Sequence, residues 1–166
     1  MINTMDRIKV GIVGTGFMAV AHIRAYHQVD GAEIAALCNP SGRHLDGDFS
    51  DVHSNVGSDE PVKLDMTNIA AYRGLEKMLA DASINLIDIT TPTFLHREQT
   101  LAALTAGKHV LCEARMAMNF SESQQMLETS RENSSLISQL VPAPFTLHSD
   151  KTIRSYIDED RLGKIL

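Results

Sequence analysis

The sequence predicts an α/β protein built on a doubly wound parallel sheet, and two observations carry this prediction. Short apolar runs of strand length recur along the 166 residues, and stretches with a helical spacing of apolar residues separate them. Strands that alternate with helices form a parallel sheet joined by right-handed crossovers. The strand order expected for such a sheet is 3-2-1-4-5-6.

The strands are expected where the short apolar runs occur. "RIKVGIV" and "INLIDIT" both suit strands that are buried on both faces of the sheet. "PVKL" is a shorter run inside a polar, Gly-rich stretch, and we assign it as the third strand. In chain order, the expected strands are 7–13, 32–38, 61–64, 84–90, 109–113 and 136–141.

The helices are expected where apolar residues recur at helical spacing or where a capping residue is suitably placed. Thr93 can cap the helix that follows it, and Gly107 suits the left-handed position that ends this helix. Ser121 with Gln124 resembles a capping box. In 68–79, the residues expected on one helical face are Ile69, Tyr72, Leu75 and Leu79. In chain order, the expected helices are 20–29, 68–79, 94–106, 122–133 and 148–159.

The composition and charge favour one globular domain and exclude several classes of partner. The net charge of −6 is spread over interspersed acidic and basic residues, so no nucleic acid and no membrane partner is expected. No apolar stretch is long enough for a signal peptide or a membrane span, and we expect a cytoplasmic protein. The spacing of cysteines and histidines indicates no metal site. Cys38 and Cys112, three strand steps apart in the expected order, are predicted to be buried free thiols.

The segment "GTGFMA" at 14–19 lies between the first expected strand and the first expected helix, which is the context of a dinucleotide-binding loop. Gly14 permits a tight turn, and Gly16 has no side chain to block a pyrophosphate. Ala19 takes the place of a third glycine and still allows close packing of helix on strand. The phosphates would bind the unpaired N–H groups at the helix start. The alternative is an ordinary strand–helix turn that uses glycine.

The residues after the second strand leave the choice between NAD and NADP open. An acidic residue about 20 positions after the loop usually binds the ribose 2′-hydroxyl. Asn39 stands at that place here, and Ser41 and Arg43 are candidates for holding the 2′-phosphate of NADP. The alternative is a polar turn after a strand, in which Arg43 is solvated.

Three blocks of the sequence, "VGIVGTGFMAVAH", "DITTPTFLHREQTLAALTAGKHVLCE" and the final "RLGKIL", resemble the Gfo/Idh/MocA family of NAD(P)-dependent oxidoreductases. Members of that family pair an N-terminal Rossmann domain with a C-terminal α/β domain that holds the substrate. They typically oxidise or reduce a hydroxyl or carbonyl on a sugar, a cyclitol or a related small molecule. The resemblance implies a Rossmann domain over 1–145, followed at 146–166 by a crossover helix and the start of a C-terminal domain. That substrate domain is expected to be absent from this chain.

The resemblance also implies where the cofactor binds. By position, the residues that would contact NAD or NADP are Gly14, Thr15, Gly16, Phe17, Met18, Thr91, Pro92, Leu95, His96 and Glu113. Glu113 would approach the nicotinamide ribose, whereas the others form the diphosphate loop and the cleft after the fourth strand. The alternatives are a helix start for Pro92, a core position for Leu95 and a surface position for His96. His22 matches a histidine common in the family, and we expect it to have a packing role.

Two departures from the family pattern bear on activity. The family motif Glu-Lys-Pro is replaced here by Glu113-Ala114-Arg115. Ala114 has no polar atom that can polarise a substrate oxygen, and Arg115 stays protonated, which makes it a poor proton shuttle. Hydride transfer also needs a substrate held close to the cofactor, and the substrate domain is expected to be missing. We therefore predict no catalytic residue in this chain and no turnover.

Three functions are consistent with the sequence. The first is the NAD(P)-binding domain of an oxidoreductase whose longer form acts on a sugar, polyol or cyclitol. The second is a stand-alone, non-catalytic module that binds a dinucleotide for regulation or interaction. The third is a remnant that binds nothing, or only a partner protein. The apolar residues expected to favour a homo-oligomer or a partner chain are Ile153, Tyr156, Ile157, Ile165 and Leu166.

Overall fold

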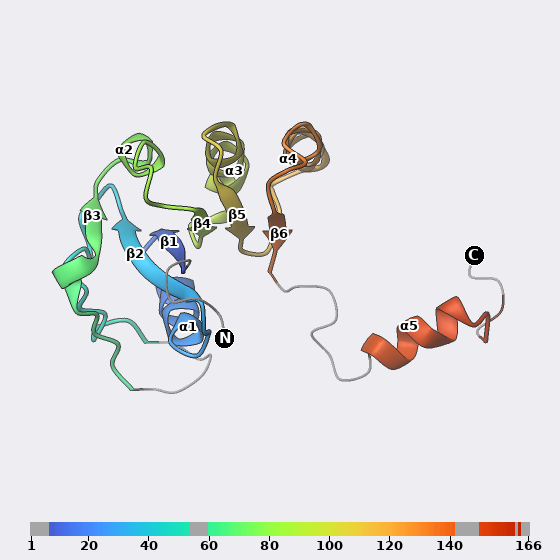
Figure 1. Cartoon of the computed structure of the whole chain (residues 1–166), viewed down its shortest axis with the longest axis horizontal. Helices are drawn as coiled ribbons and strands as arrows, with labels where there is room; N and C mark the ends of the chain where they lie inside the picture. The colour runs from blue at the N-terminus through green and yellow to red at the C-terminus, as the bar shows by residue number, and fades with distance from the viewer. Residues whose placement is uncertain (1–6, 54–59, 142–149, 162, 164–166) are drawn as a thin grey trace.

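Six parallel strands form one sheet in the order β3-β2-β1-β4-β5-β6 (Figure 1). The computed structural model describes residues 7–53, 60–141, 150–161 and 163. The strands are β1 Ile8–Val13, β2 Ala32–Cys38, β3 Ala70–Tyr72, β4 Leu86–Ile89, β5 His109–Cys112 and β6 Ser138–Leu140. The predicted fold class and strand order are therefore confirmed, and the strand order reverses between β1 and β4.

Helices cover both faces of this sheet. They are α1 Phe17–Tyr26, α2 Leu75–Leu79, α3 His96–Thr105 and α4 Phe120–Glu132, with short 3₁₀ turns at Met66–Asn68 and Thr93–Leu95. A further helix, α5 Asp150–Asp158, follows later in the chain. Figure 1 shows α2, α3 and α4 side by side on one face, with α1 on the other. The side chains of β1 alternate accordingly, because Val10 and Ile12 pack in the core under α1, whereas Val13 packs in the opposite core. The sheet is thus buried on both sides, as in other doubly wound folds.

The prediction of the third strand was wrong. Residues 61–64 contribute only an isolated antiparallel bridge between Asp48 and Lys63, and the third strand of the sheet is Ala70–Tyr72. This strand lies inside the stretch predicted as a helix, which is helical only from Leu75. The predicted apolar face does not exist, because Ile69 packs in the core on the α1 side and Tyr72 packs in the other core.

The predicted helix ends have mixed outcomes. Gly107 has a φ of +75° and ends α3 in the left-handed conformation, as predicted. Thr93 caps no helix, because it is itself the first residue of the 3₁₀ turn. The capping box at Ser121 is also wrong, since Asn119 caps α4 by accepting a hydrogen bond from the Glu122 N–H at 3.0 Å.

Helix α5 confirms the described part of the last predicted helix, with residues 148 and 149 outside the described ranges. Ile153, Tyr156 and Ile157 are exposed on it, whereas Ile165 and Leu166 lie outside the described residues. Self-association through this segment stays a prediction. No helix among the described residues is long and apolar enough to cross a membrane. The same residues contain no group of three or more His, Cys, Asp or Glu side chains arranged to hold a metal ion.

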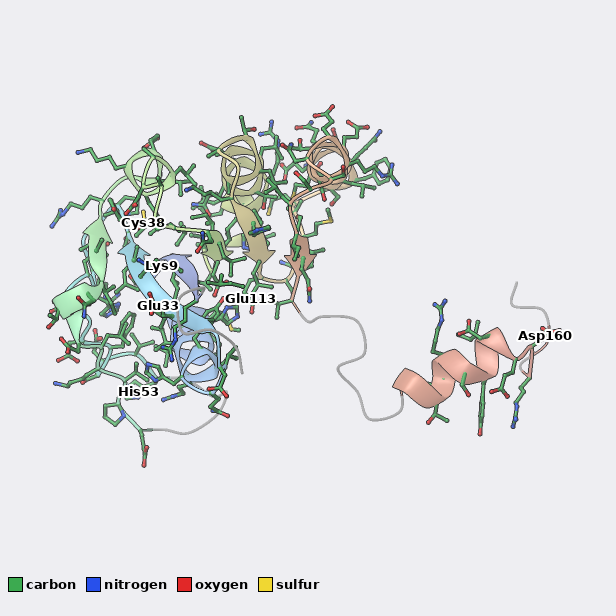
Figure 2. The ribbon with its side chains drawn as sticks, viewed as in Figure 1. Lys9, Glu33, Cys38, His53, Glu113 and Asp160 are labelled. Carbon is green, nitrogen blue, oxygen red and sulfur yellow. The ribbon has the colours of Figure 1, made fainter. Side chains whose placement is uncertain are left out.

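Both cysteines are buried free thiols at the ends of strands separated by three steps in the sheet, as predicted (Cys38 is labelled in Figure 2). Burial, with a smaller contribution from Glu76, raises the pKa of the Cys38 thiol to about 11. Burial also raises the pKa of the Cys112 thiol to about 12. Both thiols are therefore protonated at any pH near neutrality.

We expect both cysteines to resist alkylation in the folded chain. At pH 8 a thiol with a pKa of about 11 is roughly 0.1% thiolate, whereas an unperturbed thiol is roughly one quarter thiolate. Iodoacetamide should label the native chain at least about 100-fold more slowly than the urea-unfolded chain, with the native rate rising as the pH is raised. Rapid labelling of the native chain at pH 8 would contradict the burial of these thiols.

Candidate functional site

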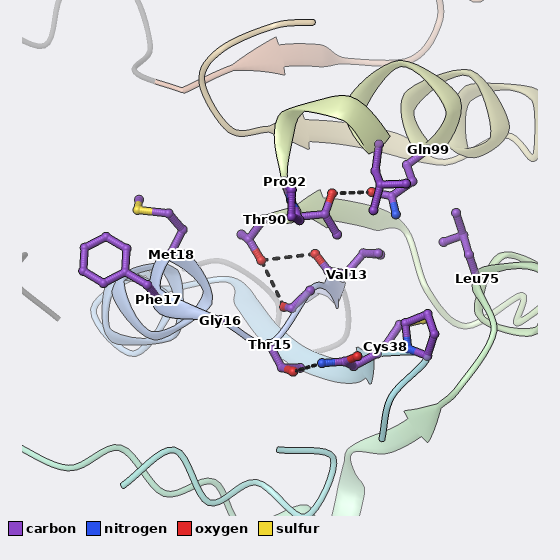
Figure 3. Close-up of a pocket in the computed structure, with 15 residues that line it drawn as sticks. Val13, Thr15, Gly16, Phe17, Met18, Cys38, Leu75, Thr90, Pro92 and Gln99 are labelled. Atoms are coloured by element: carbon purple, nitrogen blue, oxygen red, sulfur yellow. Dashed lines mark hydrogen bonds between the residues drawn. The ribbon is translucent and has the colours of Figure 1, made fainter. Parts of the chain in front are cut away.

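The glycine loop begins with a backbone turn that only glycine accommodates without strain. Gly14 follows β1 with a φ of +92°, and its N–H donates to the Cys38 carbonyl at 2.9 Å. A Cβ at this position would lie 3.0 Å from the carbonyl carbon and oxygen of Thr90. The Thr90 hydroxyl in turn donates to the carbonyls of Val13 and Gly14 at 3.1 and 3.0 Å (Figure 3). The turn is therefore fixed between β1, β2 and the end of β4.

The second glycine of the loop faces open space at the start of α1. Gly16 is the N-terminal capping position of this ten-residue helix, and no side chain caps the helix there. A Cβ on Gly16 would meet no atom within 4 Å. The first N–H groups of an uncapped helix carry partial positive charge and favour an anion. By contrast, the Asn119 side chain caps the first turn of α4.

A cavity of about 440 Å³ opens next to this loop, at the carboxyl ends of β1, β2 and β4 (Figure 3). Its size is within the range for a cofactor site, and it lies where the strand order reverses. The predicted cofactor residues that line it are Gly14, Thr15, Gly16, Phe17, Met18, Asn39, Thr91, Pro92 and Leu95. Sequence reasoning missed the apolar walls supplied by Val13, Cys38 and Leu75, although the strand order places the ends of β1 and β2 here.

Ser41 and Arg43 line a second cavity of about 460 Å³, which shares Thr15, Gly16, Phe17 and Asn39 with the first. The Asn39 amide is used within the loop, because its Nδ2 donates to the Thr15 hydroxyl at 2.5 Å and its Oδ1 accepts from the Ser41 N–H at 3.0 Å. Arg43 is largely exposed, but its Nη2 lies 2.9 Å from a carboxylate oxygen of Asp51. Arg43 is therefore ion-paired rather than simply solvated.

His96 is buried, which excludes the surface position considered for it. It is 1% exposed, and its ring nitrogens lie 2.8 Å from the carbonyl oxygens of Thr91 and Arg115. The imidazole thus joins the turn after β4 to the segment after β5, and it lines neither of the two cavities. The Ala114–Arg115 peptide bond next to it is cis.

Glu113, labelled in Figure 2, belongs to a buried chain of polar groups that sequence reasoning did not predict. His22 lies between two carboxylates, with Nδ1 2.7 Å from Asp88 and Nε2 2.8 Å from Glu113. Burial disfavours the imidazolium, but the hydrogen bonds and charges of the two carboxylates outweigh it and raise the pKa of His22. Burial and the nearby Asp88 carboxylate also raise the pKa of the Tyr26 hydroxyl.

This chain of groups holds Glu113 rather than presenting it to either cavity. Glu113 is 7% exposed, and its Oε2 accepts a hydrogen bond from the Ala114 N–H at 2.8 Å. The sequence led us to expect a packing role for His22, but its ring also makes contacts of hydrogen-bond length with both carboxylates. The signal that was available is Asp88, an acidic residue in the middle of the apolar run "INLIDIT".

Fold and site together define a dinucleotide-binding domain of the Rossmann type, with its glycine loop at the point where the strand order reverses. The family described as "Oxidoreductase family, NAD-binding Rossmann fold" matches residues 8–140. The chain therefore belongs to the Gfo/Idh/MocA family of NAD-binding oxidoreductases.

Among curated proteins, levoglucosan dehydrogenase of Pseudarthrobacter phenanthrenivorans is 26% identical over 163 residues, which cover 98% of this chain and 40% of that protein. The 1,5-anhydro-D-fructose reductase of Ensifer adhaerens is 33% identical over 122 residues, covering 74% of this chain and 32% of that protein. The chain thus spans less than half the length of these relatives.

Solved structures show the same fold. The scyllo-inositol dehydrogenase of Lactobacillus casei, with bound NAD(H) and scyllo-inositol, superposes with a TM-score of 0.75 at 21% identity. The match covers 96% of this chain and 43% of that one. The WlbA dehydrogenase of Bordetella pertussis, in complex with NADH and UDP-GlcNAcA, gives a TM-score of 0.73 at 23% identity and covers 96% of this chain and 44% of that one.

Proposed function

We propose that residues 1–145 bind NAD(P) as the Rossmann domain of an oxidoreductase that acts on a sugar, a cyclitol or a similar hydroxyl or carbonyl compound. The observation that supports this is the open space at Gly16, where a helix without a side-chain cap faces a cavity of about 440 Å³. Residues 146–166 would then lead toward a substrate domain, in which case α5 is the crossover helix.

Each part of the cavity suits one part of a dinucleotide. The N–H groups that start α1 would hold the pyrophosphate beside Gly16. The apolar side chains of Val13, Leu75 and Leu95 would contact the adenine ring. Thr91 and Glu113 lie beyond the adjacent strands β4 and β5, the side on which the nicotinamide half would extend. A bound nicotinamide supplies hydride transfer, and these residues would position it.

The substrate class is proposed from the relatives. Levoglucosan and scyllo-inositol, from which two of the similar dehydrogenases take their names, are both polyhydroxylated rings. This chain spans about 40% of the length of these two proteins.

Ala114 supports a second candidate function. A methyl group cannot polarise a substrate oxygen or transfer a proton, and exposed Arg115 stays protonated. A non-catalytic module that binds a dinucleotide for regulation or interaction would need no group at that position. Both functions share cofactor binding, and they differ in turnover.

We predict saturable dinucleotide binding without turnover. NADH and NADPH are each titrated with the purified chain, and the fluorescence emission of the nicotinamide is followed. The chain contains no tryptophan that would disturb this signal. Saturation by at least one of them is expected, with no change in nicotinamide absorbance when scyllo-inositol or levoglucosan is added with NAD or NADP. Failure of both dinucleotides to saturate would contradict the proposed function. Turnover by this chain would contradict the role given to Ala114.

A further inference from the structure

The loop after β2 forms one side of the second cavity. Phe49 is 1% exposed and anchors the loop in the core on the α1 side. The ring of His44 packs on Phe49 with 5.1 Å between ring centroids. His44 also has a φ of +56°, a left-handed conformation that non-glycine residues rarely adopt and that costs free energy. The surrounding contacts hold this side chain in one place.

His44 links the glycine loop to a carboxylate. Its Nδ1 donates to the Thr15 carbonyl at 2.7 Å, and its Nε2 lies 2.8 Å from Oδ1 of Asp51. The second oxygen of Asp51 accepts a hydrogen bond from Nη2 of Arg43 at 2.9 Å. The hydrogen bond from Arg43 has the larger effect in lowering the pKa of Asp51, and the hydrogen bond with His44 lowers it further. The Asp51 carboxylate is therefore charged at neutral pH. Asp51 and Arg43 are both largely exposed, and pairs of that kind add little stability. The arrangement therefore has no evident structural purpose.

The position of Asp51 suits recognition of the adenosine ribose. In Rossmann folds an acidic residue after the second strand binds the 2′-hydroxyl, but here Asn39 stands there with its amide occupied by Thr15 and Ser41. Among the described residues that line the second cavity, Asp51 is the acidic one. This cavity adjoins the first along Thr15 and Asn39, on the side of the loop next to β2.

We propose that Asp51, held by His44 and Arg43, selects NAD over NADP by accepting a hydrogen bond from the ribose 2′-hydroxyl and repelling a 2′-phosphate. This inference rests on the proposed cofactor binding. The negative charge of Asp51 would repel a 2′-phosphate, and the phosphate would also compete with the Asp51 carboxylate for the Arg43 guanidinium. Without the carboxylate, Arg43 becomes free to bind the phosphate, which guanidinium groups do through paired hydrogen bonds.

The test compares the dissociation constants of NADH and NADPH for four forms of the chain. The wild type is expected to bind NADH at least about tenfold more tightly than NADPH, because one negative charge opposes the phosphate at short range. Asp51→Asn should reduce this preference by about tenfold, mainly through tighter NADPH binding. The double variant Asp51→Asn with Arg43→Gln should lose that gain in NADPH binding. Asp46→Asn removes the same charge from the same loop outside the cavity, and it should leave the preference unchanged.

The outcomes separate this inference from the proposed function. A wild type that prefers NADPH overturns the inference, and so does an Asp51→Asn preference within about twofold of the wild-type value. If no form of the chain binds either dinucleotide, the proposed function itself fails, and the inference falls with it. Thermal unfolding of the four forms is measured in parallel. If Asp51→Asn unfolds early, the dissociation constants of all four forms are measured at a temperature at which each of them is folded, and the same criteria decide.

Discussion

Replacing Gly16 by valine is expected to abolish dinucleotide binding while leaving the domain folded. A Cβ at this position meets no atom of the surrounding fold within 4 Å, so a side chain can start here without a clash. Its backbone is extended, with a φ of −98° and a ψ of −158°, which valine adopts readily. The branched side chain would instead fill the space where a pyrophosphate approaches the N–H groups of α1. We expect NADH binding to weaken by at least about 100-fold, or about 2.7 kcal/mol.

Gly14→Ala is the matched comparison, because it changes the other glycine at the start of the loop, where the expected effect is on folding and not on cofactor binding. The left-handed φ of +92° and the approach of a Cβ to within 3.0 Å of the Thr90 backbone make any side chain strained. We expect the free energy of unfolding to fall by about 2–4 kcal/mol in urea denaturation, whereas Gly16→Val changes it by less than about 0.5 kcal/mol. Normal NADH affinity in Gly16→Val would show that the open space does not receive a phosphate.

The central strands were predictable because they are buried on both faces, which favours short apolar runs such as "VGIV" in β1. The third strand was not, for two reasons. Ala70–Tyr72 is a short edge strand, so its sequence contains too few residues to display a period of two. The apolar residues of 68–79 also happen to recur at helical spacing, although they pack in different cores. Pairing with Ala36–Cys38 on β2 decided the conformation, and pairing is not visible in a local pattern.

The candidate site was also only partly predictable from the sequence. The glycine loop was predictable because its residues are contiguous and each has a local reason, such as the positive φ at Gly14. In the second cavity, Ser41 and Arg43 were predicted. Asp51 and His44 were not, because they reach the cavity from a polar loop without any period, which is anchored through Phe49. The contacts of His22 are also non-local, since Asp88 is on β4 and Glu113 follows the end of β5. An acidic residue within an apolar strand indicates a buried partner, but not which residue it is.

Asp88→Ala is expected to cause the largest loss of stability among exchanges of charged residues in this domain. Asp88 is fully buried, and its carboxylate lies 2.7 Å from His22. Removing one member of a buried ionic pair leaves the other without compensation, which costs about 3–5 kcal/mol. We expect the lower end, about 3 kcal/mol, because Glu113 remains hydrogen-bonded to the same imidazole. Urea denaturation measures this loss, and Asp30→Ala is the control, since Asp30 is exposed and should change stability by less than about 0.5 kcal/mol.

The same group of residues predicts how stability depends on pH. The pKa of His22 is raised in the folded chain above its ordinary value of 6.5, despite the opposing effect of burial, because Asp88 and Glu113 flank the ring. Above pH 6.5 the folded state therefore retains a proton that the unfolded state has released, and the free energy of unfolding falls as the pH rises toward the folded pKa. Below pH 6.5 this contribution is fully present.

His22→Gln isolates the contribution of this one group from those of the other histidines. Glutamine can still hydrogen-bond to a carboxylate but does not titrate, so the variant should be less stable than the wild type at pH 6. The difference in unfolding free energy between the two proteins should then shrink as the pH increases, by up to about 1.4 kcal/mol per pH unit within the window between the unfolded and folded pKa values. Urea denaturation at a series of pH values measures it. A difference that stays constant from pH 6 upward would mean that His22 is not held as an imidazolium between the two carboxylates, and that one of the carboxylates carries the proton instead.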